Sequence, residues 1–199
     1  MDFGGRERIS ESEKLANPAP LGLACFALTT FLLSILNAQL ASKDLAGVIV
    51  SCAVIYGGAV QIMAGMWEIR KGSTFGAIAF SSYGGFWISL GLILLLEFLH
   101  VWTVSTVTLG MFLLAWTLFT FYLWVGTFRI SRALMSTFSL LLLTFVLLDV
   151  GHLAQIPIAN VFGGYVGILC ALNAWYVSAA MLLNELFKRE VLPLGNLKQ

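Results

Sequence analysis

The chain places a histidine three residues after an acid at two points, Asp149 with His152 and Glu97 with His100. Residues i and i+3 of a helix share one face, and histidine titrates near neutral pH. Each pair could therefore exchange protons with water. Asp149 and His152 form a candidate proton-sensing pair, with a structural ion pair as the alternative. Neither histidine has a third or fourth ligand at a spacing suited to zinc, so no metal site is expected.

Two further acids stand beside basic residues. Glu68 precedes the basic pair at 70–71, and Glu185 precedes the basic pair at 188–189. Acids within a membrane are often proton relays, but an acid next to basic residues at the end of an apolar run has a simpler interpretation. Interfacial ion pairing is the favoured hypothesis for both.

Uncharged polar side chains occur within the apolar runs. In lipid each of them must find a partner or face water, and an interhelical hydrogen bond is the ordinary role for any one of them. Together their donors could line a path for a small, weakly held anion such as acetate, since neutral dipoles offset the desolvation of a carboxylate only weakly. The candidates are Thr29, Thr30, Gln61, Ser81, Ser82 and Asn173.

An aromatic residue followed by two glycines occurs at Tyr56, Tyr83 and Phe162. Glycine pairs let helices approach closely in a membrane, so a helix contact is predicted at each of them. Tyr83 allows a second interpretation because two serines precede it. An aromatic side chain among polar neighbours could face a narrow pore, and Tyr83 is the strongest single candidate for that role.

The composition places these residues in a membrane protein. Hydrophobic residues make up 59% of the chain, charged residues 11%, and the mean hydropathy is +0.92, whereas soluble domains contain about 25% charged residues. No phosphate-binding loop, H-E-x-x-H or G-x-S-x-G motif is present, so neither an enzyme nor a cofactor is expected. The net charge of +1 and the scattered basic residues exclude nucleic acid as a partner.

Six apolar runs predict an all-α membrane protein with six transmembrane helices, since each run has about the 20 residues that a span needs. The runs are 21–41, 45–67, 75–99, 103–126, 132–151 and 157–187. They form one transmembrane domain, residues 17–190, which occupies most of the chain.

The connections between the runs set the orientation. The Lys and Arg residues predicted on one side are Arg6, Arg8, Lys14, Arg70, Lys71, Arg129, Arg132, Lys188, Arg189 and Lys198, against Lys43 on the other. Positively charged loops stay in the cytoplasm. Both termini are therefore predicted to be cytoplasmic, with residues 1–16 and 191–199 as short tails of a multi-pass protein of the plasma or inner membrane.

The segment at the start of the first run is the most specific motif. Its sequence, residues 17–23, is Asn-Pro-Ala-Pro-Leu-Gly-Leu. Proline suits the first turn of a helix and disrupts its interior, so the first helix should begin at about Pro20. The heptapeptide resembles the signature of the acetate uptake transporter family, the succinate/acetate permeases. Residues 56–65, 72–76, 82–87, 126–128, 184–185 and 191–193 are also similar to the patterns of that family.

The resemblance implies six-helix protomers that assemble as a homo-hexamer in the lipid bilayer, each with a path for acetate and succinate-like small carboxylates. It implies a constriction formed by Phe26, Tyr83 and Leu141. It also implies that the signature lines the inner entrance of the path, with Asn17, Pro18, Pro20, Leu21 and Gly22. Asp149 and His152 depart from the family pattern, in which neutral residues are expected.

The predicted function is membrane transport of acetate and other short carboxylates, as an anion channel or as a proton-linked permease. Both use the same pore, and they differ in whether substrate accumulates against a gradient. A carboxylate-binding membrane sensor or scaffold without transport is the alternative. An intramembrane enzyme ranks last, because no group of Ser, His and Asp stands out at one depth of the membrane.

Overall fold

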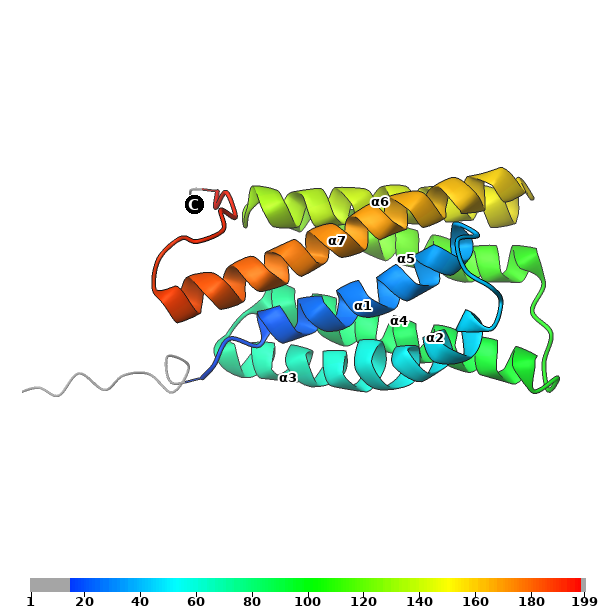
Figure 1. The fold of residues 1–199 in the computed structure, drawn as a ribbon, viewed down its shortest axis with the longest axis horizontal. Helices are drawn as coiled ribbons and strands as arrows, with labels where there is room; N and C mark the ends of the chain where they lie inside the picture. Colours follow the sequence, from blue (N-terminus) through cyan, green and yellow to red (C-terminus); the bar gives the residue numbers. More distant parts are fainter. Residues whose placement is uncertain (1–14, 198–199) are drawn as a thin grey trace, which may run out of the picture.

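The structure, a computed structural model, describes residues 15–197 as a bundle of long helices (Figure 1). The helices are α1 (Ala19–Asn37), α2 (Leu45–Val54), α3 (Gln61–Lys71), α4 (Thr74–Phe98), α5 (Thr106–Thr127), α6 (Arg132–Leu153) and α7 (Pro157–Phe187). A π-helical segment, η2 (Ile55–Val60), joins α2 to α3 as one helix. Six helices are therefore long and apolar enough to cross a membrane, which confirms the predicted spans.

Local sequence explains where the helices begin. The side chains of Ser73, Ser105 and Ser131 precede α4, α5 and α6, and each accepts a hydrogen bond from the backbone N–H three residues later. Such caps satisfy one of the amide groups that a helix N-terminus leaves unpaired. Prolines occupy the first turns of α1 and α7. The predicted start near Pro20 is confirmed, since α1 begins one residue earlier.

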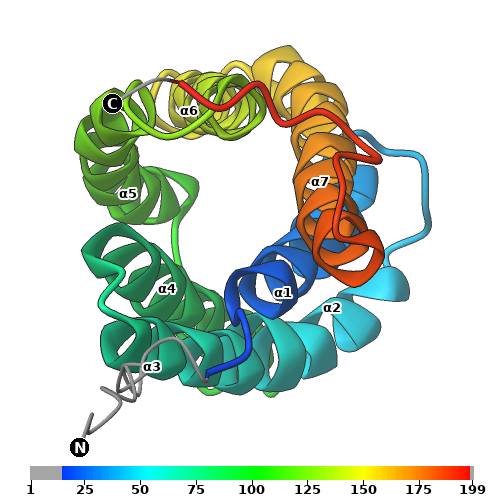
Figure 2. The ribbon, with the colours of Figure 1, turned by 90° about the vertical axis from the view of Figure 1, so that its left-hand side faces the viewer.

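Five helices form a ring around the long axis of the bundle. Seen from one end, α4, α5, α6, α7 and α1 follow one another around it (Figure 2). The continuous helix formed by α2, η2 and α3 packs outside this ring, against α1 and α4. The large buried residues, many of them aromatic, come mainly from α4, α5 and α6 and face the interior of the ring.

The glycine pairs lie at helix contacts, as predicted. A Cβ atom on Gly57 would collide with Thr29, and one on Gly84 would collide with Ile62. Gly164 lies against the backbone at Ala38. The π-helical turn at the first glycine pair was not foreseen from the sequence. Segments of this kind widen the backbone locally, and they occur often at functional sites.

Both ends of the described chain lie at one end of the bundle, called here the terminal end (Figure 1). Residues 191–197 fold back over this end and are called the strap. The strap bonds to the start of α6, where the Arg132 and Ala133 amides donate to the Gly195 and Leu194 carbonyl oxygens. The predicted tail of residues 1–16 lies almost entirely outside the described residues.

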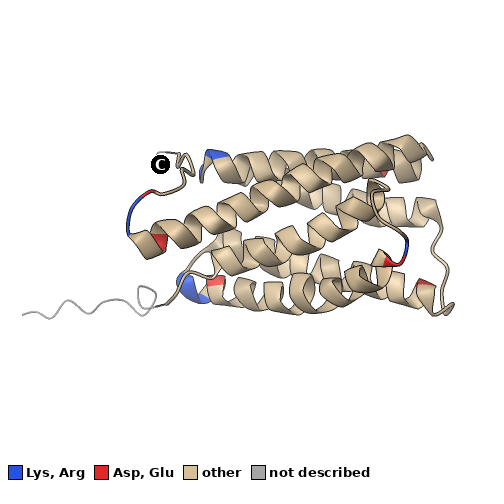
Figure 3. Ribbon diagram, in the orientation of Figure 1, with Lys and Arg blue, Asp and Glu red and all other residues tan. Residues whose placement is uncertain are grey.

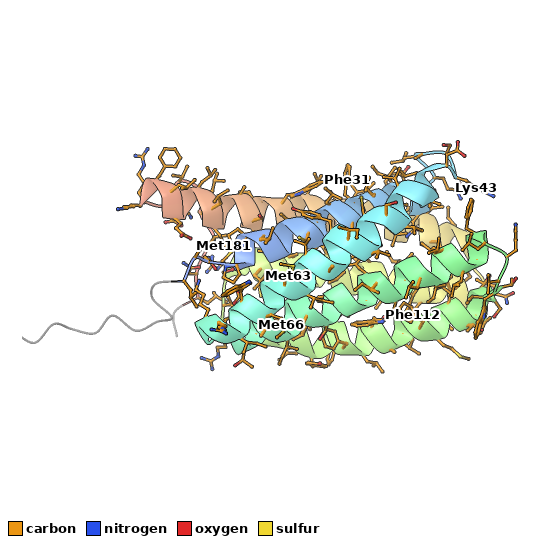
Figure 4. All side chains as sticks on the ribbon, turned by 90° about the horizontal axis from the view of Figure 1, so that it is seen from below. Phe31, Lys43, Met63, Met66, Phe112 and Met181 are labelled. Carbon is orange, nitrogen blue, oxygen red and sulfur yellow. The ribbon has the colours of Figure 1, made fainter. Side chains whose placement is uncertain are left out.

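Charged residues gather at the two ends (Figure 3). The basic residues at 70–71, 129, 132 and 188–189 lie at the terminal end, and Lys43 lies at the opposite end, called here the far end (Figures 3 and 4). The outward surface between the ends is apolar. Met63 and Met66 on α3, for example, are each more than half exposed (Figure 4). Such a surface requires lipid or another protein around it, and the chain is a multi-pass membrane protein.

Candidate functional site

Two cavities lie inside the ring of helices. The terminal cavity has a volume of about 280 Å³ and is lined by residues of the terminal end, among them Asn17, Lys71 and Leu194. The far cavity has a volume of about 40 Å³ and extends toward the end of α1 at Asn37. The two cavities have three lining residues in common, Phe26, Tyr83 and Leu141. These three residues, called here the neck, therefore separate the cavities.

The neck draws one residue from each of three helices. Phe26 comes from α1, Tyr83 from α4 and Leu141 from α6, and all three belong to one buried cluster. The rings of Phe26 and Tyr83 lie 5.8 Å apart between centroids at an angle of 53°. At least 93% of each neck side chain is buried. The residues that the family resemblance indicated as a constriction are thus brought together at the narrow point between the cavities.

The Tyr83 hydroxyl is held by a neighbouring helix. Its oxygen lies 2.8 Å from Oγ1 of Thr120 on α5, and either atom can be the donor. Each hydroxyl carries one hydrogen. When Thr120 donates, the hydrogen of Tyr83 remains free to bind a carboxylate oxygen. Aromatic rings support Tyr83 from several sides, including Phe119 at 5.4 Å and Phe138 at 6.2 Å.

Polar groups line one side of the terminal cavity. The Lys71 ammonium donates a hydrogen bond of 2.8 Å to Oδ1 of Asn17. Gln61 is fully buried where η2 passes into α3, and neither Oε1 nor Nε2 has a hydrogen-bond partner in the described structure. An unpaired buried amide is costly. Gln61 is therefore suited to bind a polar guest in this cavity.

Glu68 is the carboxylate of the terminal cavity. Its side chain is only 3% exposed, and Oε1 has no hydrogen-bond partner among residues 15–197. The ion pair expected with the neighbouring basic residues is not formed there. Lys71 reaches Asn17 instead, and the Arg70 guanidinium lies 6.0 Å from the ring centroid of Trp67 on the outer surface. The ion pair predicted from the sequence therefore gave Glu68 the wrong partner, because helix spacing alone does not reveal which way a long side chain turns.

The far cavity also contains polar atoms without protein partners. Oγ1 of Thr30 and Nε1 of Trp87 are buried and unpaired in the described structure, and both residues line the cavity. Thr30 was predicted from the sequence, since a hydroxyl in an apolar run is easily recognised. Trp87 was not considered, because an indole in an apolar run reads first as a hydrophobic residue.

The other predicted pathway residues lie away from the two cavities. Thr29 donates to the Cys25 carbonyl oxygen at 2.8 Å and packs against Gly57. Asn173 joins α7 to α6 through Thr137 and Ser136. The residues outside both cavity linings are Pro18, Pro20, Leu21, Gly22, Thr29, Ser81, Ser82 and Asn173.

Within the signature segment, Asn17, Ala19 and Leu23 line the terminal cavity, and of the five residues predicted for the entrance only Asn17 does so. Pro18 and Pro20 act through their carbonyl oxygens, which accept from Gly22 N–H and from the Ser178 hydroxyl. Gly22 lies against the Phe80 ring, and Leu21 is 45% exposed on the outer surface. In this structure the segment fixes the start of α1 against its neighbours and so positions Asn17 and the neck.

Asp149 and His152 form no hydrogen bond or ion pair with each other in the described structure. Oδ2 of Asp149 lies 2.6 Å from the Thr117 hydroxyl, whereas the His152 ring nitrogen Nδ1 lies 2.8 Å from the Leu148 carbonyl oxygen. α6 continues through Gly151, as the shared helix face required. Neither side chain belongs to the lining of either cavity.

Fold and site together define a multi-pass membrane protein with a cavity on each side of a narrow aromatic neck. The chain matches the GPR1/FUN34/yaaH family over residues 4–196, and it belongs to that family.

Proteins similar to this chain have names that refer to acetate. The chain is 42% identical over 183 residues to the "Succinate-acetate/proton symporter SatP" of Escherichia coli K12, covering 92% of this chain and 96% of that protein. It is 37% identical over 210 residues to "Acetate permease A" of Emericella nidulans, covering 96% of this chain and 70% of that protein. A solved structure described as the bacterial acetate channel SatP matches with a TM-score of 0.87 and 41% identity, covering 91% of this chain and 99% of that one. The resemblance seen in the sequence is thereby confirmed.

Proposed function

We propose that this protein transports acetate and other short carboxylates, succinate among them, across a membrane. The observation that carries the proposal is the neck, because Phe26, Tyr83 and Leu141 alone are common to the linings of the two cavities. Movement of these side chains would join the cavities into one path. Relatives named as an acetate permease, an acetate channel and a succinate-acetate/proton symporter support this function rather than an enzyme.

The neck suits a small anion. Three bulky side chains exclude bulk water and large solutes, and the Tyr83 hydroxyl offers one donor at the narrowest point. Unpaired polar atoms stand on both sides of it, Gln61 in the terminal cavity and Thr30 in the far cavity. These neutral groups bind a carboxylate weakly, which lets the anion leave again. Conduction requires such weak binding.

Orientation and assembly belong to the same proposal. The basic residues of the terminal end favour a cytoplasmic location for it, with both termini inside the cell and the helices in the plasma or inner membrane. The apolar outer surface offers contact area for lipid and for further copies of the chain. A homo-hexamer, with one path in each protomer, is the assembly that the family resemblance implies.

The decisive experiment is uptake of labelled acetate by the purified protein in sealed liposomes. Empty liposomes are the control, because acetic acid crosses lipid unaided. We expect an initial rate above that of empty liposomes, reduced by an excess of unlabelled acetate. Acetate binding without protein-dependent flux would reject transport and support the sensor or scaffold. The absence of both binding and flux would reject both functions.

A further inference from the structure

We propose that Glu68 is the proton-binding site that couples carboxylate movement to proton movement, an inference that rests on the proposed transport function. Glu68 lies near the C-terminal end of α3 and lines the terminal cavity. No other carboxylate lines either cavity in the described part of the chain. A proton carried with the substrate would therefore bind here.

The side chain is placed for exchange with the cavity. It is only 3% exposed, yet Oε1 has no hydrogen-bond partner in the described structure. The first turn of α4 lies directly against the carboxyl group, since a Cβ atom on Gly76 would collide with it. A fold that needed Glu68 only as a structural acceptor would give this oxygen a donor. The unpaired oxygen is instead available to a guest.

Few charged residues lie around Glu68 in the part of the chain that the structure describes. On its own helix, Lys71 lines the same cavity and donates to Asn17, while Arg70 turns to Trp67. α1, packed against α3, carries no charged residue. α4, the other neighbour, carries only Glu97, at its far end.

Across the terminal cavity, the stem of Arg132 packs beside Gly195 of the strap, and its side chain is outside the cavity lining. Tyr83 is the remaining titratable group of the lining. Among residues 15–197, Lys71 and Glu68 are therefore the pair that sets the charge of the terminal cavity.

This charge balance couples the two solutes. With Glu68 ionised, its negative charge offsets Lys71 and repels an entering carboxylate. When a proton from water binds a Glu68 oxygen, the net charge of the cavity becomes positive, and the new O–H can donate to the substrate. A proton on Glu68 raises the affinity of the cavity for the substrate anion. Because linkage is reciprocal, the bound anion raises the affinity of Glu68 for a proton by the same factor. Both solutes then leave together, and the proton returns to water.

The test measures proton uptake during acetate binding. The full-length protein in detergent is titrated with acetate in a calorimeter, in two buffers that differ in their enthalpy of ionisation. The difference in heat gives the number of protons taken up per acetate bound. At neutral pH we expect a net uptake of protons by the native protein, up to the limit of about one per acetate for one linked site, and almost none for Glu68→Gln. Glu185→Gln, an exposed acid at the same end of the bundle, is the matched control and should behave as the native protein.

Each outcome decides the assignment. Equal proton uptake in Glu68→Gln and the native protein would overturn it, as would acetate binding to the native protein without any proton uptake. If Glu68→Gln binds no acetate, Glu68→Asp is measured. Proton-linked binding in that variant supports the site, and loss of binding there overturns it. Absence of both acetate binding and flux in the native protein would instead reject the proposed transport function.

Discussion

Tyr83 on α4 and Thr120 on α5 join their hydroxyl groups at 2.8 Å inside the membrane-spanning part of the bundle. α4 and α5 otherwise meet through aromatic rings, such as those of Phe86 and Trp116 at 5.2 Å between centroids, and this hydrogen bond ties the two helices at the level of the neck. Thr120 is fully buried, and Tyr83 is 3% exposed. The position of the Tyr83 ring therefore depends on a partner outside the cavity lining.

Replacing Thr120 by valine tests this tie. The substitution keeps the shape of the side chain and removes the hydroxyl, so we expect a loss of about 1 kcal/mol in the free energy of unfolding, the usual net value of one hydrogen bond. Thermal unfolding in detergent measures it. Combined with Tyr83→Phe, which removes the other hydroxyl, the two losses should be less than additive. Fully additive losses would mean that the hydroxyls do not interact.

Enlarging the neck should relax size selectivity. In Phe26→Ala or Tyr83→Ala the removed ring leaves space between the two cavities, so flux of a larger carboxylate such as benzoate should rise several-fold relative to acetate. Each variant should also lose about 3–5 kcal/mol of stability, as ring deletions in well-packed cores do. Competition between labelled acetate and benzoate in liposomes gives the ratio.

The matched control for the neck is Phe98→Ala. Phe98 is also an aromatic residue of α4, but it is 77% exposed at the far end of the helix. Its replacement should leave the benzoate to acetate ratio unchanged. If both neck variants keep the native ratio as well, Phe26 and Tyr83 do not form the sieve.

Gln61→Leu should separate stability from transport. Its buried amide has no partner in the described structure, so an apolar side chain of similar size should leave the unfolding temperature unchanged or raise it. Acetate would lose one donor, and the concentration for half-maximal flux should rise about fivefold, corresponding to one hydrogen bond of about 1 kcal/mol. A destabilised variant with native transport would show that Gln61 serves the fold alone.

The hydrophobic runs, with the prolines at the start of the first one, predicted the architecture well. The six spans agree with the observed helices to within a few residues at most ends, since an apolar run of membrane length has few alternatives in lipid. The turn at η2 was missed because a single extra residue in a helical turn leaves no clear mark on hydropathy. The two glycines inside it were seen, and their contacts were predicted.

The site could be predicted only in part. Phe26 and Leu141 came from the family resemblance alone, and no periodicity in the sequence would have selected them from 15 phenylalanines and many leucines. Tyr83 was also selected as a pore candidate from its own neighbours, two serines and a pair of glycines. Glu68 was assigned to an ion pair because its basic neighbours are close in sequence. The direction of the Lys71 side chain depends on Asn17, 54 residues away. Contacts of that kind are invisible to local pattern analysis.

Asp149→Asn tests whether the pH dependence of uptake arises from Asp149 and His152 or from Glu68. If Asp149 and His152 sense protons, the variant should shift the pH profile of acetate uptake. We expect no shift, because neither residue lines a cavity and Asp149 bonds to Thr117. Uptake by the native protein and the variant is compared between pH 5 and pH 8, the range in which histidine titrates. A displaced profile would instead assign proton sensing to Asp149 and His152.

Loosening the strap should expose it to proteases. Oδ1 of Asn184 accepts from the Val191 and Leu192 amides at 2.7 and 3.0 Å, and its Nδ2 donates to the Leu192 carbonyl oxygen at 2.8 Å. Asn184→Ala removes these bonds, so a nonspecific protease should cleave within residues 191–197 several times faster than in the native protein.

Tyr176→Phe is the graded control for the strap, because it removes a single bond, from the Tyr176 hydroxyl to the Pro193 carbonyl oxygen at 2.7 Å. Its cleavage rate should lie between those of the native protein and Asn184→Ala. Leu194 of the strap lines the terminal cavity, so a released strap would also open that cavity to solvent. Equal cleavage of all three proteins would mean that the bonds to α6, rather than Asn184, hold the strap in place.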